Sequence, residues 1–341
     1  MTQIDNPYRG TGLALGMPDV SINSSAPARL LQRCPEAGET PLRRADELAV
    51  RAGVAQVWIK DERSRMGLGS FKALGAAYVI AHDSCVLGLD MADRCYVTAS
   101  AGNHGLSVAA GARAFGARAV VYLADTVPES FAQRLRGQGA EVVRAGAIYE
   151  DSMAAALQAA GDNGWILLSD SSWEGYVDTP HRLMEGYLVL AAEIAAQMYQ
   201  PPTHVYLQAG VGGLAAATGA YLRSVWGDGP RMIVVEPEAA PALQASIAAG
   251  RFVVSSGPAS CMGRLDCKEA SLIALQGLSR DVDAFVTISE SAAQAVLPVL
   301  ADAAFATSAS GGAGLAALLA GMGGIDATSR VLCILSEEPA E

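Results

Sequence analysis

The chain has 341 residues, of which 51% are hydrophobic and 17% are charged, and its formal net charge is −11. A chain of this length suffices for one large domain or two ordinary ones, each with its own core. The negative charge argues against nucleic acids and anionic membranes as partners. An anionic ligand must therefore be held by local groups, such as the N–H groups at a helix N-terminus.

Short apolar strands alternate along the chain with longer helical stretches. From the N-terminus, the pattern predicts strands at residues 57–60, 94–98, 119–123, 141–144, 205–208, 232–235 and 331–335. It predicts helices at residues 70–82, 104–115, 129–137, 151–160, 179–198 and 215–225. This alternation is typical of βαβ units, so the predicted fold class is α/β with a mostly parallel sheet.

Two further patterns concern the location of the protein. Residues 1–12 lack the basic and then apolar pattern of a secretory signal, and no apolar stretch is long enough to span a bilayer. The six cysteines are scattered without Cys-x-x-Cys pairs or nearby histidines, as is typical of reduced thiols. We therefore expect a cytoplasmic protein with no metal site and no membrane or nucleic acid partner.

The first chemical candidate is a lysine at the start of a predicted helix. Lys72 follows a Gly-rich turn and the dipeptide Ser70-Phe71. The positive end of the helix dipole disfavours a cation there and lowers the pKa of the amine, which suits a lysine that must form a Schiff base. The alternative is a surface lysine near a helix start.

The second candidate is the turn that reads Thr-Ala-Ser-Ala-Gly-Asn-His-Gly over residues 98–105, between a strand and a helix. Small residues and exposed N–H groups at a helix N-terminus form a cradle for a carboxylate or a phosphate. The Asn103 amide is available to a ligand oxygen. The alternative is an ordinary turn in which Asn103 caps the helix.

The third candidate is the turn Gln-Ala-Gly-Val-Gly-Gly-Leu at residues 208–214, again between a strand and a helix. Backbone amides without side chains wrap a phosphate, and the helix dipole adds to the attraction. Gly210, Gly212 and Ala215 also match a dinucleotide fingerprint, and Glu236 follows at the spacing of a ribose-binding acid. This segment alone therefore leaves an NAD-binding unit open.

The fourth candidate is Ser336, directly after the strand at residues 331–335. The carboxyl ends of parallel strands border the crevice in which α/β sheets bind ligands.

In this order and spacing, the four segments resemble the fold-type II family of pyridoxal-phosphate enzymes, which includes threonine and serine dehydratases, the tryptophan synthase β-subunit and cysteine synthases. The resemblance implies two open, mostly parallel twisted sheets with helices on both faces. It also implies a large cofactor-binding domain at residues 1–78 plus 191–341, a small inserted α/β domain at residues 79–190, and a homodimer.

The resemblance implies pyridoxal 5′-phosphate as the cofactor and gives each segment a role. Lys72 forms the Schiff base, Asn103 bonds the phenolic oxygen, and Ser336 contacts the pyridine nitrogen. The phosphate group is bound by Gly210, Val211, Gly212, Gly213 and Leu214. The substrate is bound by Ser100, Ala101, Gly102, Asn103 and His104, the first four of which hold its carboxylate.

A narrower resemblance is to diaminopropionate ammonia-lyases. Its most specific mark is Asp-x-x-Trp-Glu-Gly-Tyr at residues 170–176, which general dehydratases lack, and a further mark is Met-Glu-Gly-Tyr at residues 184–187. The resemblance implies that Asp170 is both catalytic and substrate-binding. Its carboxyl group either protonates the leaving group or recognises a β-ammonium group.

The sequence departs from these ammonia-lyases at two places. They carry an aspartate directly before Gly-Asn-His, where this chain has Ala101, as threonine dehydratases do. The segment at residues 308–312 also lacks the glutamate that is usual in both families. Without an acid at position 101, only Lys72 supplies a base, so we expect a preference for the L-enantiomer.

We therefore expect a carbon–nitrogen lyase that eliminates ammonia from a small amino acid similar to 2,3-diaminopropionate and gives a 2-oxo acid such as pyruvate. A dehydratase of L-threonine, serine or 3-hydroxyaspartate with the same fold is the alternative. An NAD-linked oxidoreductase leaves Lys72 and Asn103 without a role. A non-catalytic pyridoxal-phosphate-binding protein is consistent with the two missing acids.

Overall fold

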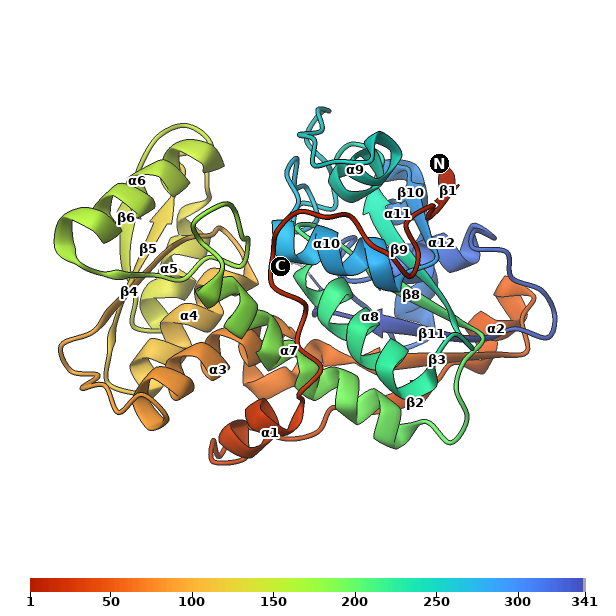
Figure 1. The fold of residues 1–341 in the computed structure, drawn as a ribbon, viewed down its shortest axis with the longest axis horizontal. Helices are drawn as coiled ribbons and strands as arrows, with labels where there is room; N and C mark the ends of the chain where they lie inside the picture. The colour runs from red at the N-terminus through yellow and green to blue at the C-terminus, as the bar shows by residue number, and fades with distance from the viewer. Residues whose placement is uncertain (340–341) are drawn as a thin grey trace.

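The computed structural model describes residues 1–339, which form two β-sheets covered by helices (Figure 1). The large sheet has the strand order β1-β10-β9-β8-β11-β3-β2, and the small sheet has the order β6-β5-β4-β7. Every strand pair is parallel except the edge pairs β1–β10 and β2–β3. The predicted fold class, with two mostly parallel sheets, is confirmed.

The strands of the large sheet come from both ends of the described chain. They are β1 (Gln3–Asp5), β2 (Leu42–Arg44), β3 (Gln56–Asp61), β8 (His204–Gln208), β9 (Arg231–Pro237), β10 (Ala284–Ile288) and β11 (Arg330–Leu335). The strands of the small sheet are consecutive: β4 (Cys95–Ala99), β5 (Arg118–Leu123), β6 (Glu141–Arg144) and β7 (Ile166–Leu167).

Alternate residues of the central strands enter two different cores, because successive side chains of a strand point to opposite faces. Leu207 and Val234 belong to the core on one face, and Tyr206 and Val235 to the core on the other. The first face is covered by α7 (Asp178–Gln197), α8 (Gly213–Trp226), α9 (Ala242–Ala249) and α10 (Leu272–Asp281). The second is covered by α2 (Asp46–Ala52), α11 (Glu290–Asp302) and α12 (Ala313–Leu319).

The small sheet is covered in the same way. One face packs on α6 (Tyr149–Asn163), and the other on α4 (Asn103–Ala114) and α5 (Glu129–Gly137). The short helix α1 (Ser25–Leu31) packs on α3 (Lys72–Cys85) and α7. None of the helices within residues 1–339 has the length and hydropathy needed to cross a membrane.

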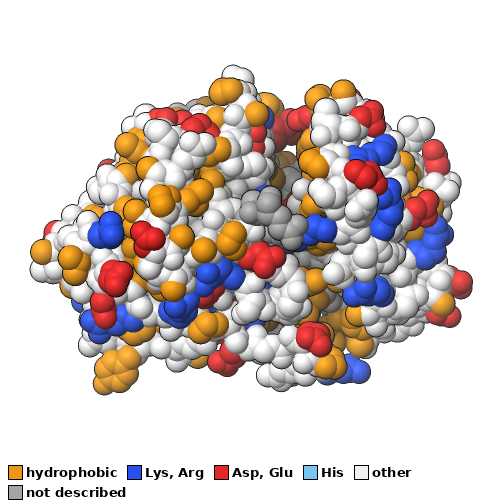
Figure 2. Space-filling model, turned by 180° about the vertical axis from the view of Figure 1, so that it is seen from behind, with side chains coloured by type: hydrophobic (Ala, Val, Ile, Leu, Met, Phe, Trp, Pro, Cys, Tyr) orange, Lys and Arg blue, Asp and Glu red, His pale blue; other side chains and the backbone are white. Residues whose placement is uncertain are grey.

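Helices α3 and α7 lie side by side between the two sheets (Figure 1). Glycines allow this close approach: a Cβ atom on Gly186 would lie 2.5 Å from the carbonyl oxygen of Leu74, and one on Gly75 would lie 2.8 Å from Cγ of Leu183. The predicted domain limits at residues 78/79 and 190/191 fall inside these two helices. The division into two domains therefore stays a prediction. Seen from behind, the surface is hollowed between the lobes that hold the two sheets (Figure 2).

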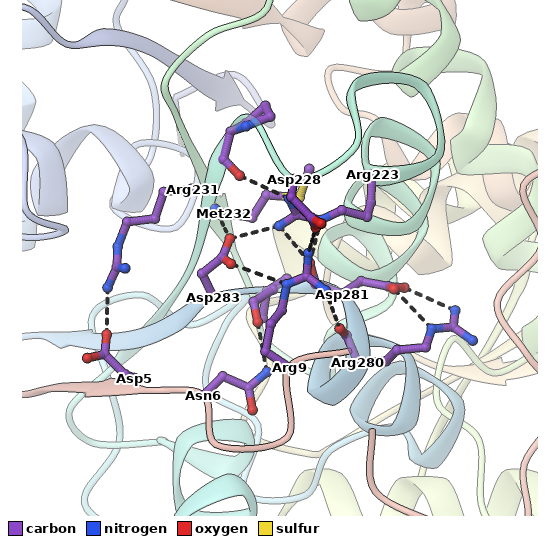
Figure 3. A network of polar contacts seen from close by, with 12 residues as sticks. Asp5, Asn6, Arg9, Arg223, Asp228, Arg231, Met232, Arg280, Asp281 and Asp283 are labelled. Carbon is purple, nitrogen blue, oxygen red and sulfur yellow. Dashed lines mark hydrogen bonds and ion pairs between the residues drawn. The ribbon is translucent and has the colours of Figure 1, made fainter. Parts of the chain in front are cut away.

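A polar network fixes the N-terminal segment to the large sheet (Figure 3). Arg9 pairs with Asp228 and, through Nε at 3.2 Å, with Asp283. The other carboxylate oxygen of Asp283 accepts from Arg223 and from the backbone N–H of Met232, each at 2.7 Å. The network joins the loop after β1 to the starts of β9 and β10.

A buried ionic cluster joins β3 and the following 3₁₀ turn η1 (Glu62–Gly67) to α7. Glu193 of α7 accepts from Lys60 and from Arg65, each at 2.6 Å, and Arg65 also pairs with Glu62 at 2.8 Å. Lys60, Glu62 and Arg65 are at most 1% exposed. Burial lowers the pKa of Lys60 despite the attraction of Glu193. The position of α7 thus depends on compensated charges as well as on apolar packing.

Candidate active site

Lys72 is the first residue of α3, which begins two residues after the predicted helix start at residue 70. The end of β11 fixes this helix start, because the backbone N–H of Phe71 donates to the carbonyl oxygen of Ser336 at 3.2 Å. The Lys72 ammonium forms an ion pair with the Asp170 carboxylate, and each side chain is 21% exposed. The structure therefore brings together the two residues that we predict to be catalytic.

The pKa of Lys72 differs from the expectation based on the helix dipole. Burial lowers the pKa of this amine, but the Asp170 carboxylate outweighs burial, so the net pKa lies above its usual value. Burial likewise opposes ionisation of Asp170, yet the Lys72 ammonium holds the pKa of Asp170 well below its usual range. The prediction of a lowered lysine pKa is wrong, because it left out the Asp170 carboxylate.

The loop that carries Asp170 is held by its own aromatic residues. The Tyr176 hydroxyl donates to the carbonyl oxygen of Leu167 at 2.8 Å and accepts from the backbone N–H of Ser169 at 3.1 Å. The Trp173 and Tyr176 rings stack with centroids 4.4 Å apart. The Asp-x-x-Trp-Glu-Gly-Tyr motif is therefore a self-bonded turn that presents Asp170 to Lys72.

The Ser100 side chain shapes the turn before α4. The Ser100 hydroxyl oxygen accepts from the backbone N–H groups of Gly102 and Gly105, at 3.2 and 3.1 Å. The N-cap residue of α4 is Gly102, which has no side chain, and Asn103, the first residue of α4, points its amide at Glu337, with Nδ2 2.6 Å from Oε2. Asn103 is therefore not a helix cap.

Two residues beside this turn differ in exposure. Ala101 is exposed. His104 is buried, and its Nε2 lies 2.8 Å from the carbonyl oxygen of Leu168, two residues before Asp170. Burial lowers the pKa of His104, which favours a neutral ring.

The glycine-rich turn before α8 forms the second cradle. Gly212 has a φ of +100°, which favours glycine, and no side chain caps the N-terminus of α8. A Cβ atom on Gly210 would lie 2.9 Å from Sγ of Cys267, so only glycine fits there. The turn adjoins the catalytic pair, because a Cβ atom on Gly213 would lie 3.6 Å from the Tyr187 ring and 4.0 Å from the carbonyl oxygen of Asp170. Val211 lies in the same turn, and Leu214 is the second residue of α8.

Ser336 and Glu337 follow β11 at the carboxyl edge of the large sheet. Both are buried, at 4% and 3% exposure. Glu337 accepts from Asn103, from Arg264 at 3.0 Å and from the Ser308 hydroxyl. Burial raises the pKa of Glu337. We assigned a role to Ser336 alone, so sequence reasoning missed Glu337 and Arg264.

Cys267 and Tyr187 are also close to the site without an assignment from the sequence. Cys267 adjoins Gly210, and burial raises the pKa of its thiol to about 12. The Tyr187 ring centroid lies 6.0 Å from Nζ of Lys72 and packs edge-on against Phe71. The Met-Glu-Gly-Tyr motif, which ends at Tyr187, is the sequence feature from which this residue could have been predicted.

These groups fit pyridoxal phosphate. The uncapped, side-chain-free start of α8 suits a phosphate, and Lys72 supplies the amine that its aldehyde requires. The Ser70 hydroxyl is fully buried and has no hydrogen-bond partner within residues 1–339, as expected of a donor that serves a ligand.

Glu236, the acid that a dinucleotide site at the same turn would require, is bonded elsewhere. Both carboxylate oxygens of Glu236 accept backbone N–H groups at the start of α9, from Leu243 at 2.7 Å and from Gln244 at 2.8 Å. Glu236 is fully buried, and burial raises its pKa to about 8. It therefore stabilises a helix N-terminus and does not face a ribose.

Comparisons with known proteins agree on one family. Residues 34–337 match the model of the pyridoxal-phosphate dependent enzyme family. Diaminopropionate ammonia-lyase of Salmonella typhimurium is 30% identical over 96% of this chain and 92% of its own length. Human serine dehydratase-like protein is 29% identical, with 83% of this chain and 82% of that protein covered.

The solved structures show the same relationship. Diaminopropionate ammonia-lyase from Escherichia coli, in complex with an aminoacrylate–pyridoxal phosphate azomethine reaction intermediate, superposes with a TM-score of 0.87. It is 29% identical, and the superposition covers 99% of this chain and 93% of that one. A second structure of that enzyme, in complex with D-serine, superposes equally well at 28% identity.

Proposed function

We propose that this chain, which belongs to the pyridoxal-phosphate dependent enzyme family, eliminates ammonia from a small amino acid of the 2,3-diaminopropionate type. Hydrolysis of the unsaturated product then gives a 2-oxo acid, pyruvate in the case of diaminopropionate, and a further ammonia. The relatives named ammonia-lyase and dehydratase support an elimination reaction.

The chain's residues divide the work as follows. Bound pyridoxal phosphate withdraws electrons from the substrate and acidifies its α-hydrogen. Nζ of Lys72 removes that proton, and the turn at residues 100–103 orients the substrate carboxylate. The Asn103 amide and the Ser336 hydroxyl would hold the ring, and the turn at residues 210–214 would hold the phosphate.

The ion pair between Asp170 and the Lys72 ammonium is the observation that supports ammonia as the leaving group, because it places a carboxylate beside an amine in the site. Its pKa is held well below the usual range beside Lys72, so it is a carboxylate at neutral pH. A carboxylate keeps a neighbouring β-amino group protonated, which is the form that leaves as ammonia. A β-hydroxyl group needs a proton from an acid, and an ionised Asp170 has none to give.

Replacing Asp170 by asparagine should separate these roles. We expect the KM for 2,3-diaminopropionate to rise about 10-fold or more, because the variant loses the partner of the β-ammonium group. The KM for serine, which has no β-ammonium group, should change far less and serves as the internal control. If kcat falls ~10²-fold with KM unchanged, Asp170 is a general acid instead.

A dehydratase is the second candidate, and Ala101 is the residue that favours it. Initial rates on the D- and L-forms of diaminopropionate, serine, threonine and 3-hydroxyaspartate decide between the two. We expect the highest rate on L-diaminopropionate and a rate on its D-form at least about 10²-fold lower, because Ala101 leaves Lys72 as the base that the sequence assigns to the α-proton. Comparable turnover of a D-substrate would show that another residue serves the opposite face.

We also propose that the enzyme is a cytoplasmic homodimer. The resemblance to fold-type II enzymes supports the dimer, and the scattered cysteines support the compartment. Light scattering of the purified holoenzyme measures the number of subunits.

A further inference from the structure

Arg264 reaches the candidate active site from the loop between α9 and α10. Its backbone N–H donates to the Ser310 hydroxyl at 3.1 Å, which fixes the start of the side chain. The same loop packs against the glycine-rich turn, because a Cβ atom on Gly210 would lie 3.1 Å from the carbonyl oxygen of Arg264 and from Cα of Leu265. The arginine is thus anchored on the wall of the phosphate cradle.

The Arg264 side chain extends from there along the turn before α4. A Cβ atom on Gly102 would lie 3.9 Å from Cγ and 4.0 Å from Nε of Arg264. At its far end, Nη1 donates to Oε1 of Glu337 at 3.0 Å. The guanidinium therefore lies beside the turn that we expect to hold the substrate carboxylate.

One edge of this guanidinium is free. Within residues 1–339, Nη1 has the Glu337 carboxylate as its partner, and neither Nε nor Nη2 has an acceptor. The side chain is 33% exposed, so part of it is accessible to a small molecule. Nε and Nη2 present two parallel N–H groups, the arrangement that binds a carboxylate through both oxygens.

Glu337 holds this arrangement in place. One of its carboxylate oxygens accepts from Arg264 and Ser308, and the other accepts from Asn103. The same buried carboxylate thus orients a residue beside the expected substrate turn and the amide expected to contact the cofactor. With Nη1 occupied, the guanidinium cannot rotate without breaking a buried charge-assisted hydrogen bond.

We propose that Arg264 binds the α-carboxylate of the amino-acid substrate together with the turn at residues 100–103, and that Glu337 is the positioning residue for both Arg264 and Asn103. The proposal rests on the proposed function in so far as an amino acid is the substrate. It does not depend on which β-substituent leaves.

The test measures binding to the holoenzyme without turnover. The visible absorbance of the bound cofactor reports binding of two amines that both carry two methyl groups on the carbon next to nitrogen, 2-aminoisobutyrate and isopropylamine. The first carries a carboxylate but no α-hydrogen, so it is not consumed, and the second lacks the carboxylate. Arg264→Gln should weaken binding of 2-aminoisobutyrate by about 10- to 100-fold and leave isopropylamine within about 2-fold.

Three further variants make the result specific. Arg118→Gln removes an arginine from a surface ion pair in which both side chains are 59% exposed, and it should leave both affinities unchanged. Arg264→Lys keeps the charge but loses the two-donor edge, so it should weaken binding of 2-aminoisobutyrate by an intermediate factor and leave isopropylamine unaffected. This variant replaces Arg264→Gln if Arg264→Gln does not fold. Glu337→Gln should weaken binding of 2-aminoisobutyrate, because Arg264 loses its charged partner. It should also raise the Kd for pyridoxal phosphate, because Asn103 loses the same partner.

Equal losses for the two amines, or no loss for either, would overturn the proposal, since a merely structural Arg264 does not distinguish them. The experiment also separates this proposal from the proposed function. A carboxylate-specific loss in a protein that releases no ammonia from any substrate would support the role of Arg264 and contradict the elimination.

Discussion

Replacing Lys72 by alanine should abolish the visible absorbance of the holoenzyme and lower the elimination rate by about 10⁴-fold. The reason is that one amine serves twice, as the group that binds the cofactor covalently and as the base for the α-proton. Borohydride reduction followed by peptide mapping measures the first role directly. We expect the pyridoxyl label on the peptide that contains Lys72.

The chain offers an unusually clean control for this experiment, because it has only three lysines. Lys60 is fully buried in the ionic cluster with Glu193. The Lys268 ammonium is bonded to Asp266 and to the carbonyl oxygen of Ala239, each at 2.6 Å. Lys268→Ala should therefore keep the absorbance, and a label on Lys60 or Lys268 would contradict the assignment.

Replacing Glu193 by alanine should lower the free energy of unfolding by about 3–5 kcal/mol. The variant leaves the Lys60 ammonium and the Arg65 guanidinium buried without the carboxylate that compensates them. Urea unfolding of the wild type and the variant, followed by circular dichroism, measures the difference.

The matched control is Glu141→Ala, which breaks the exposed ion pair with Arg118. Exposed pairs contribute about 0–1 kcal/mol, so this variant should unfold near the wild-type midpoint. A loss for Glu193→Ala that is as small as the loss for Glu141→Ala would mean that water or a rearranged neighbour compensates the two cations.

Secondary structure was predicted best where a short contiguous segment has a distinctive composition. The apolar strands β9 and β11 and the glycine-containing turns that follow β4 and β8 are contiguous in the sequence, so these elements were predicted within a few residues. The three-residue edge strands β1 and β2 were missed, because such short segments carry no alternation. The helix α12 was missed as well, since Ala, Gly and Leu on all sides leave no polar face to define a period.

The residues of the candidate site were likewise predicted only where they belong to a contiguous motif. Lys72, Asn103 and the glycine-rich turn were found because each belongs to a contiguous motif. Glu337 and Arg264 were not found, because their pairing joins two loops that are distant in sequence. The error on the lysine pKa has the same origin, since the Asp170 carboxylate that raises it belongs to another segment.

The position of β11 determines when the large sheet can form during synthesis of the chain. This strand lies inside the large sheet, between β8 and β3, yet it follows both of them in the sequence. The strands of the small sheet, in contrast, leave the ribosome one after another and can pair early. Contacts between distant segments form slowly, so we expect the large sheet to close only after β11 has been synthesised. Until then, the nascent chain exposes the unpaired edges of β8 and β3, and this interval is when it is most prone to aggregate.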